Sequence, residues 1–345
     1  MYNLAHNDSS LLAPRSSPLT KRILVTGASG CIGHYISEAL IQETRHELYL
    51  LVRNPQKLQV DTNHRRGIHV LQGDMQNIRA FTDLLQTIDT AILAATAWGG
   101  ADTYDINVAK TQELLSLLSP KCQQVIYFST ASILDRNGNL LPQAGEIGTD
   151  YIRSKYDCHQ QLSQRAIASK TTILFPTLVV GGDTNKPYSH LTSGLPEVTK
   201  WVDLIRFFQA DGSFHFIHGR DIAQVVRYLI DHPPTEKESR CRNAPAESRS
   251  LVLGQAPLTV NQAVEEVCQY FNKKIYFRIP LTLSLANAII ALFRIQMAAW
   301  DRFCLDYRHF IYRNAVNPAT FGLPNYCATL SDVLKISGIP PRKNR

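Results

Sequence analysis

The feature that most constrains the fold is a glycine-rich stretch, ILVTGASGCIGHY, over residues 23–35. An apolar run leads directly into Gly27, Gly30 and Gly33, and residues with helical spacing follow. The first glycine allows a sharp turn, the second a close approach of the backbone to a ligand, and the third tight packing of helix on strand. The free N–H groups at the start of such a helix suit a pyrophosphate. The stretch predicts a strand–turn–helix unit that binds a dinucleotide, with a glycine-rich turn without ligand as the alternative.

Strand and helix patterns alternate through the first half of the chain. Segments with helical spacing separate six strand-like segments, RILVTG, HELYLLVRN, GIHVLQGD, DTAILAAT, QQVIYFST and TTILFPTLVV. These segments are continuously apolar, as strands buried on both faces must be. We therefore predict an α/β fold, a Rossmann-type doubly wound parallel sheet.

The pattern changes after Pro176, where a segment rich in Gly, Pro, Ser and Thr begins. A strand-and-helix signal follows, in which Asp221 is placed to cap the helix, and later Thr259 and Gln262 have the spacing of a capping box. We predict a smaller, mostly helical C-terminal substrate lobe. The expected division is a disordered tail over 1–20, a dinucleotide-binding domain over 21–177 to which 214–235 return, and a substrate-binding lobe formed by 178–213 and 236–345.

Composition narrows the classes of partner and the compartment. The chain has 345 residues, 19% of them charged, and a net charge of +7. Its basic residues form no run interleaved with aromatics, so we expect no nucleic-acid partner. Seven cysteines without a CxxC pair favour a reducing, cytoplasmic location and argue against a structural metal site, so we expect no metal. The first twenty residues lack the apolar core of a secretory signal, and organelle targeting through this tail is the alternative to a cytoplasmic location.

One apolar stretch raises the question of a membrane. Residues 281–300 have the sequence LTLSLANAIIALFRIQMAAW. Because they include the charged Arg294, they do not have the charge-free apolar length that a membrane-spanning helix needs. We favour a helix that covers the core of the second lobe, because helices that are apolar nearly all round are usually buried. Contact with a membrane surface is the alternative. A homodimer is left open by the sequence.

Two residues at predicted strand ends bear on the ligand. Arg53 stands where the NAD fingerprint has an acidic residue for the ribose 2′-OH, and an arginine there would meet the 2′-phosphate of NADP instead. We therefore predict NADP, with NAD as the alternative; a solvated charge at a strand end is the structural interpretation of Arg53. Asp74, after the third strand, lies where an adenine amino group is often met, or is a simple turn residue.

Three groups further along suggest catalysis. The segment YIRSK places Tyr151 and Lys155 four residues apart, on one face of a helix. A phenol has a reference pKa of ~10, and a neighbouring ammonium lowers it. The segment FSTAS, at the end of the fifth strand, offers Ser129, Thr130 and Ser132, whose hydroxyls could hold a substrate oxygen. All of these would lie at the C-terminal edge of the sheet, where such folds bind ligands.

In order and spacing, these motifs resemble the extended short-chain dehydrogenase/reductase family, the NAD(P)-dependent epimerase/dehydratase group. The resemblance runs from about residue 22 to about residue 271 and rests on TGASGCIG, LAA, NVAKT, YFSTAS, YIRSK, FPTLVVG and FIHGRDIA. It implies that Tyr151 is the general acid/base, that Lys155 lowers its pKa, and that Thr130, ahead of Ser129, holds the substrate oxygen.

The motifs and the resemblance together predict a set of cofactor-binding residues. Those of the glycine turn line the pyrophosphate, two alanines pack near the ribose, and the proline meets the nicotinamide end. The full set is Gly27, Ser29, Gly30, Cys31, Ile32, Gly33, Arg53, Asp74, Met75, Ala94, Ala95, Lys155 and Pro176.

The chain also departs from the family pattern. Residues 133–135, ILD, stand where the family has VYG, Lys110 replaces a usual glycine, and the loop before Tyr151 is short, so we expect a different substrate mouth. The segment GGDTNKPYSH is not typical of enzymes that act on nucleotide sugars. Histidines in or near the second lobe could touch substrate, but a lone histidine is more often structural, and we assign no role to His190, His215 and His218.

Three functions fit these features. The first is an NAD(P)-dependent oxidoreductase that transfers hydride between nicotinamide and a carbonyl or alcohol of a small-molecule substrate, while Tyr151 transfers the proton. The second is a sugar-nucleotide epimerase or dehydratase, although Ala131 and Ser132 stand where a dehydratase often has an acidic pair. The third is a non-catalytic, cofactor-sensing protein, against which the presence of both Tyr151 and Lys155 counts. We expect the first.

Overall fold

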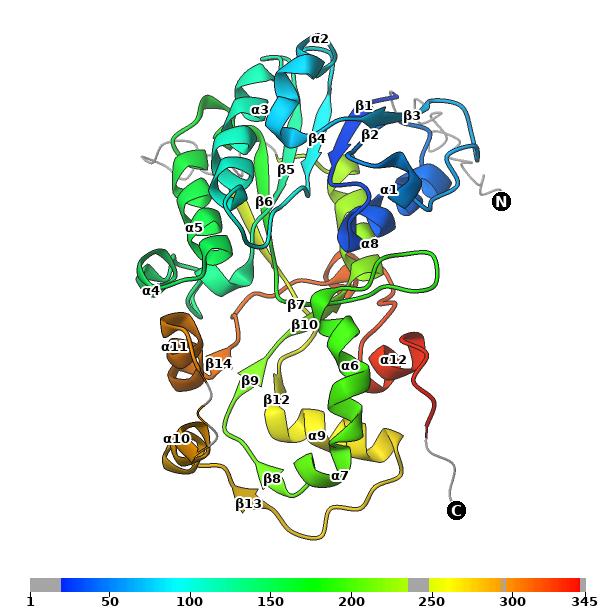
Figure 1. Ribbon diagram of the computed structural model, residues 1–345. Coiled ribbons are helices and arrows are strands. Elements are labelled where there is room, and N and C mark those ends of the chain that lie inside the picture. Colours follow the sequence, from blue (N-terminus) through cyan, green and yellow to red (C-terminus); the bar gives the residue numbers. More distant parts are fainter. Residues whose placement is uncertain (1–19, 235–247, 293, 295, 342–345) are drawn as a thin grey trace, which may run out of the picture.

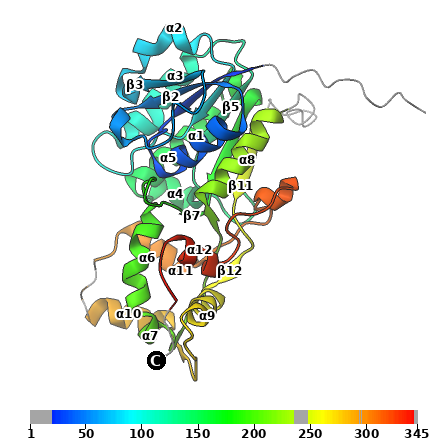
Figure 2. The same cartoon turned by 90° about the vertical axis from the view of Figure 1, so that its right-hand side faces the viewer.

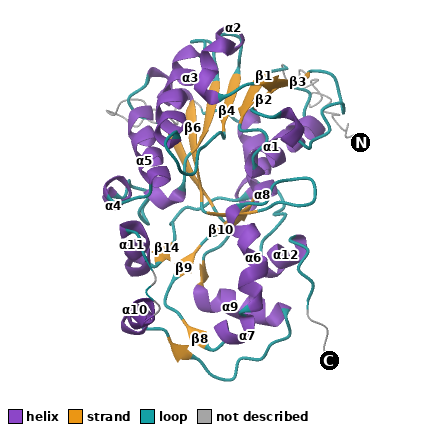
Figure 3. Cartoon of the chain, viewed as in Figure 1, coloured by secondary structure: helices purple, strands orange, loops and turns teal. Residues whose placement is uncertain are grey.

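The computed structural model describes residues 20–234, 248–292, 294 and 296–341 (Figure 1). The predicted tail over 1–20 therefore lies, except for its last residue, outside the described part of the chain. The described residues form an upper part built on a parallel sheet and a lower, mostly helical part (Figures 1 and 3). The predicted α/β fold with a smaller helical lobe is confirmed.

Seven parallel strands form the main sheet, in the order β11-β6-β5-β4-β1-β2-β3. The order reverses between β1 and β4, because the chain first runs outward through β2 and β3 and then crosses back. Ligands of open α/β sheets bind at such a switch point, outside the C-terminal ends of the strands. The strands are β1 (Arg22–Thr26), β2 (Glu47–Val52), β3 (Ile68–Gln72), β4 (Thr90–Leu93), β5 (Gln124–Phe128), β6 (Thr171–Pro176) and β11 (Arg249–Leu253).

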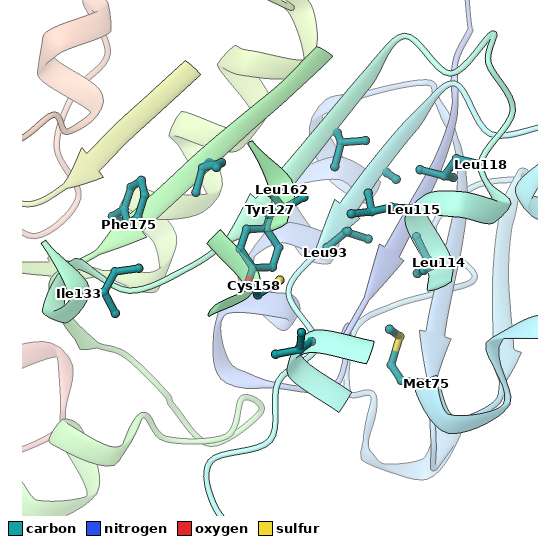
Figure 4. Close-up of a cluster of buried hydrophobic side chains, with 14 of the residues drawn as sticks. Met75, Leu93, Leu114, Leu115, Leu118, Tyr127, Ile133, Cys158, Leu162 and Phe175 are labelled. Atoms are coloured by element: carbon teal, nitrogen blue, oxygen red, sulfur yellow. The ribbon is translucent and has the colours of Figure 1, made fainter. Parts of the chain in front are cut away.

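Helices cover both faces of the sheet (Figure 2). One face packs against α1 (Cys31–Glu43) and α8 (Gly219–Asp231), and the other against α3 (Thr111–Leu117) and α5 (Asp150–Leu162). Alternate residues of each strand serve the two layers: on β1, Leu24 enters one cluster while Val25 enters the other. Figure 4 shows part of the first cluster, in which leucines of α3 and α5 close over β4, β5 and β6. Each fully buried leucine stabilises the fold by about 1.5–3 kcal/mol.

Short helical segments connect these elements. Two of them bear on the site: η3 (Asp105–Lys110) runs directly into α3, and η4 (Ala131–Ile133) follows β5. The others are η1 (Pro55–Lys57), η2 (Met75–Phe81), α2 (Thr82–Leu85), α4 (Pro142–Glu146), η5 (Ala166–Lys170) and η6 (Pro318–Phe321).

The lower lobe combines helices with short strand pairs. Its helices are α6 (His190–Lys200), α7 (Val202–Ile205), α9 (Val260–Tyr270), α10 (Leu283–Leu292), α11 (Ala299–Tyr307) and α12 (Leu330–Ile336). Between the two parts, β7 pairs with β10, and further down β9 pairs with β12 and β14, and β8 with β13 (Figure 1). These strands are β7 (Leu178–Val180), β8 (Phe208–Gln209), β9 (Ser213–Phe214), β10 (Phe216–His218), β12 (Leu258–Thr259), β13 (Ile279–Pro280) and β14 (His309–Phe310).

Strand assignments near the domain boundary differ from the sequence prediction in two places. The predicted sixth strand divides, because β6 ends at Pro176 and β7 belongs to another sheet. The strand β11 pairs with β6 in the main sheet, although the sequence placed 236–345 in the substrate lobe. Its end, Leu253, is fully buried in the core beside α8, so burial against the sheet rather than chain order decides where this strand lies.

Helix capping follows the prediction at α9 but not at α8. Thr259 and Gln262 form the predicted capping box at α9. At α8 the cap is His218, whose Nδ1 accepts a hydrogen bond from the Arg220 N–H at 3.0 Å. The predicted cap, Asp221, instead accepts hydrogen bonds from two N–H groups of the C-terminal segment, at residues 326 and 327. It lies one turn too far into the helix to cap it, and it ties that segment to α8.

The apolar stretch 281–300 is not one buried helix. It forms α10 and the start of α11, and between them Arg294 has a φ of 49°, outside the helical range. No described side chain of α10 is buried, so the prediction of a helix that covers the core of the lobe is wrong for α10. The adjacent core is filled instead from α7, α9 and α12. Within the described residues, no helix combines the length and apolarity needed to cross a bilayer.

Candidate functional site

The glycine-rich turn lies between β1 and α1, at the switch point of the sheet. Gly27 has a φ of 69°, and a Cβ there would come within 2.6 Å of the Ala95 backbone nitrogen. A Cβ on Gly33 would lie 2.1 Å from the Gly27 carbonyl oxygen, so α1 can pack against the end of β1 only with glycine there. A Cβ on Gly30 would meet only that carbonyl oxygen, at 3.3 Å, among the described atoms within 4 Å. The backbone is thus tightly packed at Gly27 and Gly33, whereas space remains for a ligand beside Gly30.

The N-terminus of α1 is left open for an anion. Gly30 provides no side-chain cap, and the first turn contains no acidic residue. The first N–H groups of any helix lack partners within it, and the dipole of this 13-residue helix adds positive potential there. A pyrophosphate supplies the missing acceptors, so these residues fit a dinucleotide.

A cavity of about 200 Å³ extends from this turn along the ends of β2 and β3. Arg53 is exposed at its rim, whereas Met75 is buried. Asp74 lines the cavity and also caps η2, since its Oδ1 accepts a hydrogen bond from the Gln76 N–H at 3.0 Å. The predicted residues that line this cavity are Gly27, Ser29, Gly30, Arg53, Asp74, Met75, Ala94 and Ala95.

A second cavity, of about 570 Å³, continues the first toward the lower lobe and shares Ala94 and Thr96 with it. Its walls come from the sheet edge, α5, α6 and α11. The remaining predicted residues line it: Cys31, Ile32, Gly33, Ser129, Thr130, Tyr151, Lys155 and Pro176. Every predicted site residue therefore lines one of the two connected cavities, while the role of each stays a prediction.

The candidate catalytic groups meet on one wall of the larger cavity. Lys155 is 2% exposed, and its Nζ donates a hydrogen bond to the Phe128 carbonyl at 2.8 Å. The same Nζ lies 6.0 Å from the centroid of the Tyr151 ring. The Thr130 hydroxyl donates a hydrogen bond to Ser132 Oγ at 3.3 Å and lies near enough to the Tyr151 hydroxyl to lower the pKa of the phenol. Ser129 Oγ is buried and has no hydrogen-bond partner among the described residues, so it is available to a ligand.

Burial sets the protonation of the lysine and the tyrosine. It lowers the pKa of Lys155 to about 8. Burial also raises the pKa of Tyr151 above its usual value, against a smaller lowering by the nearby Thr130 hydroxyl. The predicted lowering of the Tyr151 pKa by Lys155 is therefore not what this structure shows, because desolvation of the phenolate outweighs an ammonium 6.0 Å from the ring. Tyr151 holds its proton and faces the cavity as a donor.

A buried asparagine, Asn107, fixes the loop that joins the two cavities. Its Oδ1 accepts hydrogen bonds from the Thr96 hydroxyl and the Ala97 N–H, and its Nδ2 donates to the Ala97 carbonyl, at 2.8–3.0 Å. Nδ2 also donates to Ser154 Oγ on α5, at 3.0 Å. The side chain thus ties the loop after β4 to the helix that carries Tyr151. Its segment, NVAKT, contributed to the resemblance, but sequence reasoning gave Asn107 no role.

Sequence reasoning also missed the aromatic walls of the larger cavity. Trp98 stacks on Tyr151. It also meets His190 edge-on, with 4.7 Å between the centroids of the Trp98 and His190 rings. Trp300, at the start of α11, lines the same cavity from the other lobe. Neither tryptophan belongs to a motif or a periodic pattern, so the sequence contained no signal for them.

The three histidines divide between the site and the framework. His190 lines the larger cavity. His215 is buried, with its Nδ1 hydrogen-bonded to the Gln255 carbonyl at 2.6 Å and its Nε2 accepting from the Tyr312 N–H at 3.1 Å. His218 caps α8. No group of three or more His, Cys, Asp or Glu in the described part of the chain is arranged to hold a metal ion.

Comparison with known proteins identifies similar folds and sequences. Residues 23–243 match the family described as the NAD dependent epimerase/dehydratase family. The fold is similar to that of dTDP-glucose 4,6-dehydratase of Bacillus anthracis, solved in complex with NAD, with 14% identity, a TM-score of 0.58, and coverage of 93% of this chain and 96% of that one. It is also similar to UDP-glucuronic acid 4-epimerase of Bacillus cereus, with 16% identity, a TM-score of 0.57, and coverage of 92% and 98%.

Among curated proteins, Quinone oxidoreductase 2 of Escherichia coli is 34% identical over 76 residues, which are 22% of this chain and 26% of that protein. Equisetin synthetase of Fusarium heterosporum is 26% identical over 165 residues, 44% of this chain. The chain thus spans between 4% and 26% of the length of these curated relatives.

Proposed function

The chain belongs to the NAD dependent epimerase/dehydratase family, and on that premise we propose that it is an NAD(P)-dependent oxidoreductase. Its substrate is a small apolar molecule with one reactive carbonyl or alcohol. The reaction is reversible hydride transfer between the nicotinamide and the carbon that bears this oxygen.

The lining of the larger cavity carries this proposal. Around the Thr130–Tyr151–Lys155 group, the walls are mostly apolar and include two tryptophans. Lys155 and His190 are the basic residues that line it, and no arginine does so among the described residues. A nucleotide sugar carries a diphosphate, which proteins commonly hold with arginine forks or clustered N–H groups. An uncharged apolar substrate matches this lining better.

The residues around the cavities have complementary roles in the proposed reaction. The glycine turn and the N-terminus of α1 would hold the pyrophosphate, and the buried Ser129 hydroxyl is available to the nicotinamide end. The cofactor supplies or accepts the hydride. Thr130 orients the substrate oxygen, and Tyr151, which holds its proton in this environment, gives that proton to the oxygen in the direction of reduction. Lys155, anchored on the Phe128 carbonyl, would hold the ribose and place positive charge near the phenol.

The proposed cofactor is NADP, with NAD as the alternative. Arg53 lies at the rim of the smaller cavity, at the end of β2, where it can meet a 2′-phosphate. The dehydratase of Bacillus anthracis was solved with NAD, which supports the alternative.

A second candidate function is sugar-nucleotide epimerisation, which uses the same hydride step and returns the hydride to the substrate. The names of the structural relatives favour it, since they include epimerases and dehydratases that act on nucleotide sugars. Dehydration is less well supported, because Ala131 and Ser132 take the place of an acidic pair. The curated quinone oxidoreductase is named for redox chemistry on an apolar carbonyl compound, which favours the first candidate.

The two candidates differ in what happens to the cofactor. The purified protein is incubated with NADPH or NADH and a panel of quinones and apolar ketones, and in parallel with UDP- and dTDP-hexoses. Stoichiometric loss of reduced nicotinamide with an apolar carbonyl supports the oxidoreductase. Conversion of a nucleotide sugar without net change in the cofactor contradicts it in favour of the epimerase. Cofactor binding without turnover of either panel contradicts both.

A further inference from the structure

The lower end of the second lobe exposes a group of large apolar side chains. We name this group the apolar tip; its members are Trp201, Leu204, Tyr276, Phe277, Ile279, Leu285 and Leu292. Tyr276 is 76% exposed and Leu292 77% exposed, values that are unusual for side chains of this size. Exposed apolar side chains gathered at one end of a protein commonly mark an interaction site.

The elements that carry the tip lie together. Figures 1 and 2 both show α7 and α10 at the lower end of the molecule, and Figure 1 shows β13 there, between the loop that follows α9 and the start of α10. The loop between α9 and β13 is held against the turn between α7 and β8 by stacking of Phe277 on Phe207, with 4.9 Å between ring centroids. The Ile279 N–H donates a hydrogen bond to the Phe207 carbonyl at 2.7 Å, where β13 joins β8. The stacking and the strand pairing between β13 and β8 thus hold the backbone that carries the aromatic side chains in place.

The charge of this region is one-sided. Residues 267–300 contain no Asp or Glu but include Lys273, Lys274, Arg278 and Arg294. Their net charge of +4 is more than half of the +7 of the whole chain. Two of these cations pair with acids of neighbouring helices, Lys273 with Asp203 at 2.8 Å and Arg278 with a glutamate of α9 at 3.0 Å. Lys274 and Arg294 are exposed, and in the sequence they flank the members of the apolar tip that lie between residues 276 and 292.

Apolar and aromatic side chains flanked by cations match the chemistry of a membrane surface. Tyrosine, tryptophan and leucine enter the boundary between headgroups and acyl chains, and Lys and Arg bind anionic headgroups. A second copy of the chain is a poorer match, because two tips facing each other would bring the exposed cations Lys274 and Arg294 of both copies together. We propose that the apolar tip docks this protein on the surface of an anionic lipid bilayer, without spanning it.

Docking at this place has a consequence for the site. The helix α10 leads through residues 293–298 into α11, whose Trp300 lines the larger cavity. The segment on the bilayer is therefore continuous with a wall of the cavity, as suits an apolar substrate that partitions into lipid. The docking proposal does not depend on the proposed function, because vesicle binding is measured without cofactor or substrate.

The test is flotation of the full chain with vesicles of phosphatidylcholine alone and of phosphatidylcholine mixed with phosphatidylglycerol. We expect flotation with the mixed vesicles, weakened by added salt, since charge attraction is screened. The double variant Tyr276→Ser/Leu292→Ser should bind the mixed vesicles at least about tenfold more weakly, as each large apolar side chain withdrawn from water strengthens binding by roughly that factor. The double variant Lys274→Gln/Arg294→Gln should bind the mixed vesicles about fivefold more weakly for each charge removed. Val70→Ser, at an exposed apolar residue of β3, is the matched control.

Equal melting temperatures of the variants and the wild type would show that the tip variants still fold. Failure of the folded wild type to float with the mixed vesicles would overturn the proposal. Equal binding by wild type and Tyr276→Ser/Leu292→Ser would also overturn it. A third outcome would overturn it as well: sedimentation shows that the wild type self-associates, the double variant does not, and neither binds vesicles. The tip would then be an interface between copies of the chain.

Discussion

The indole ring of Trp98 stacks on the phenol ring of Tyr151, with 4.3 Å between the ring centroids and 22° between their planes. Trp98 comes from the loop after β4 and is 57% exposed, whereas Tyr151 belongs to the first turn of α5. A substrate oxygen must therefore reach the phenol hydroxyl beside an aromatic surface. This arrangement favours flat or apolar substrates and explains part of the desolvation of Tyr151.

Removal of this indole should weaken substrate binding more than catalysis. Aromatic pairs are worth about 0.5–1.5 kcal/mol, so Trp98→Ala should raise KM for an apolar carbonyl about two- to tenfold and change kcat less. Steady-state kinetics with a substrate identified in the carbonyl panel measures both constants. Trp201→Ala, at a tryptophan that lines neither of the two cavities, is the control. An unchanged KM in Trp98→Ala would show that the substrate does not contact the indole.

Loss of the Tyr151 hydroxyl should abolish turnover without loss of cofactor. Tyr151→Phe keeps the ring that stacks on Trp98 but removes the proton donor, and general acid/base catalysis is worth about 10²–10⁴-fold. We expect a fall in kcat of that order with unchanged cofactor Kd, measured by calorimetry. Tyr156→Phe, on the same helix but outside the cavity lining, should keep its activity. Equal turnover in Tyr151→Phe and wild type would remove Tyr151 from the mechanism.

Burial of Lys155 should appear in the pH dependence of stability. The folded protein holds this ammonium with a pKa of about 8, lowered by burial from 10.5. Between these pH values the unfolded chain binds the extra proton, so the contribution of Lys155 to the free energy of unfolding rises with pH. The full difference corresponds to about 3 kcal/mol.

This pH dependence is measured as a difference between two proteins. The free energy of unfolding of wild type minus that of Lys155→Met should increase between pH 8 and 10.5 and stay level below pH 8. Urea titrations at several pH values give it, and other titrating groups cancel in the subtraction. A difference that falls over this range would show that Lys155 is stabilised as an ammonium in the folded protein.

The contact of Gly33 with Gly27 predicts a sharp intolerance to a methyl group. In Gly33→Ala the new Cβ would lie 2.1 Å from the Gly27 carbonyl, so α1 must move away from β1. We expect a loss of stability of about 1–3 kcal/mol and loss of dinucleotide binding. In α6, a Cβ on Gly194 would meet no described atom within 4 Å, and Gly194→Ala should stabilise the helix by about 0.5–1 kcal/mol. Thermal unfolding and cofactor titration of both variants test this contrast. Equal stability and equal cofactor binding of the two variants would contradict the prediction.

The exposed Arg53 should decide between the two nicotinamide cofactors. A hydrogen bond to a charged group is worth about 1.5–3 kcal/mol, so Arg53→Asp should shift the ratio of the NADP and NAD dissociation constants toward NAD by about 10- to 100-fold or more. Calorimetric titration with each cofactor measures the ratio. The control for the change of net charge is Arg66→Asp, at an exposed arginine just before β3 in the sheet-based part of the molecule. A ratio that stays the same in Arg53→Asp would show that this arginine does not meet a 2′-phosphate.

Much of the fold and the site could be predicted because the signals are local. The turn at Gly27, Gly30 and Gly33 and the apolar strands depend on residues within one element or between adjacent elements. The capping box at Thr259 is equally local, and it was predicted correctly. All predicted site residues line connected cavities, because parallel strands deliver their C-terminal ends to one edge of the sheet.

The sequence by itself thus determined the doubly wound sheet, the place where a dinucleotide fits, and the residues gathered at that edge. Only the tertiary structure decided the aromatic walls of Trp98 and Trp300, the raised pKa of Tyr151, the contacts of Asp221 and the exposure of α10. These features depend on how residues far apart along the chain are placed in the folded protein. Burial and desolvation arise from that placement, and no local pattern records them.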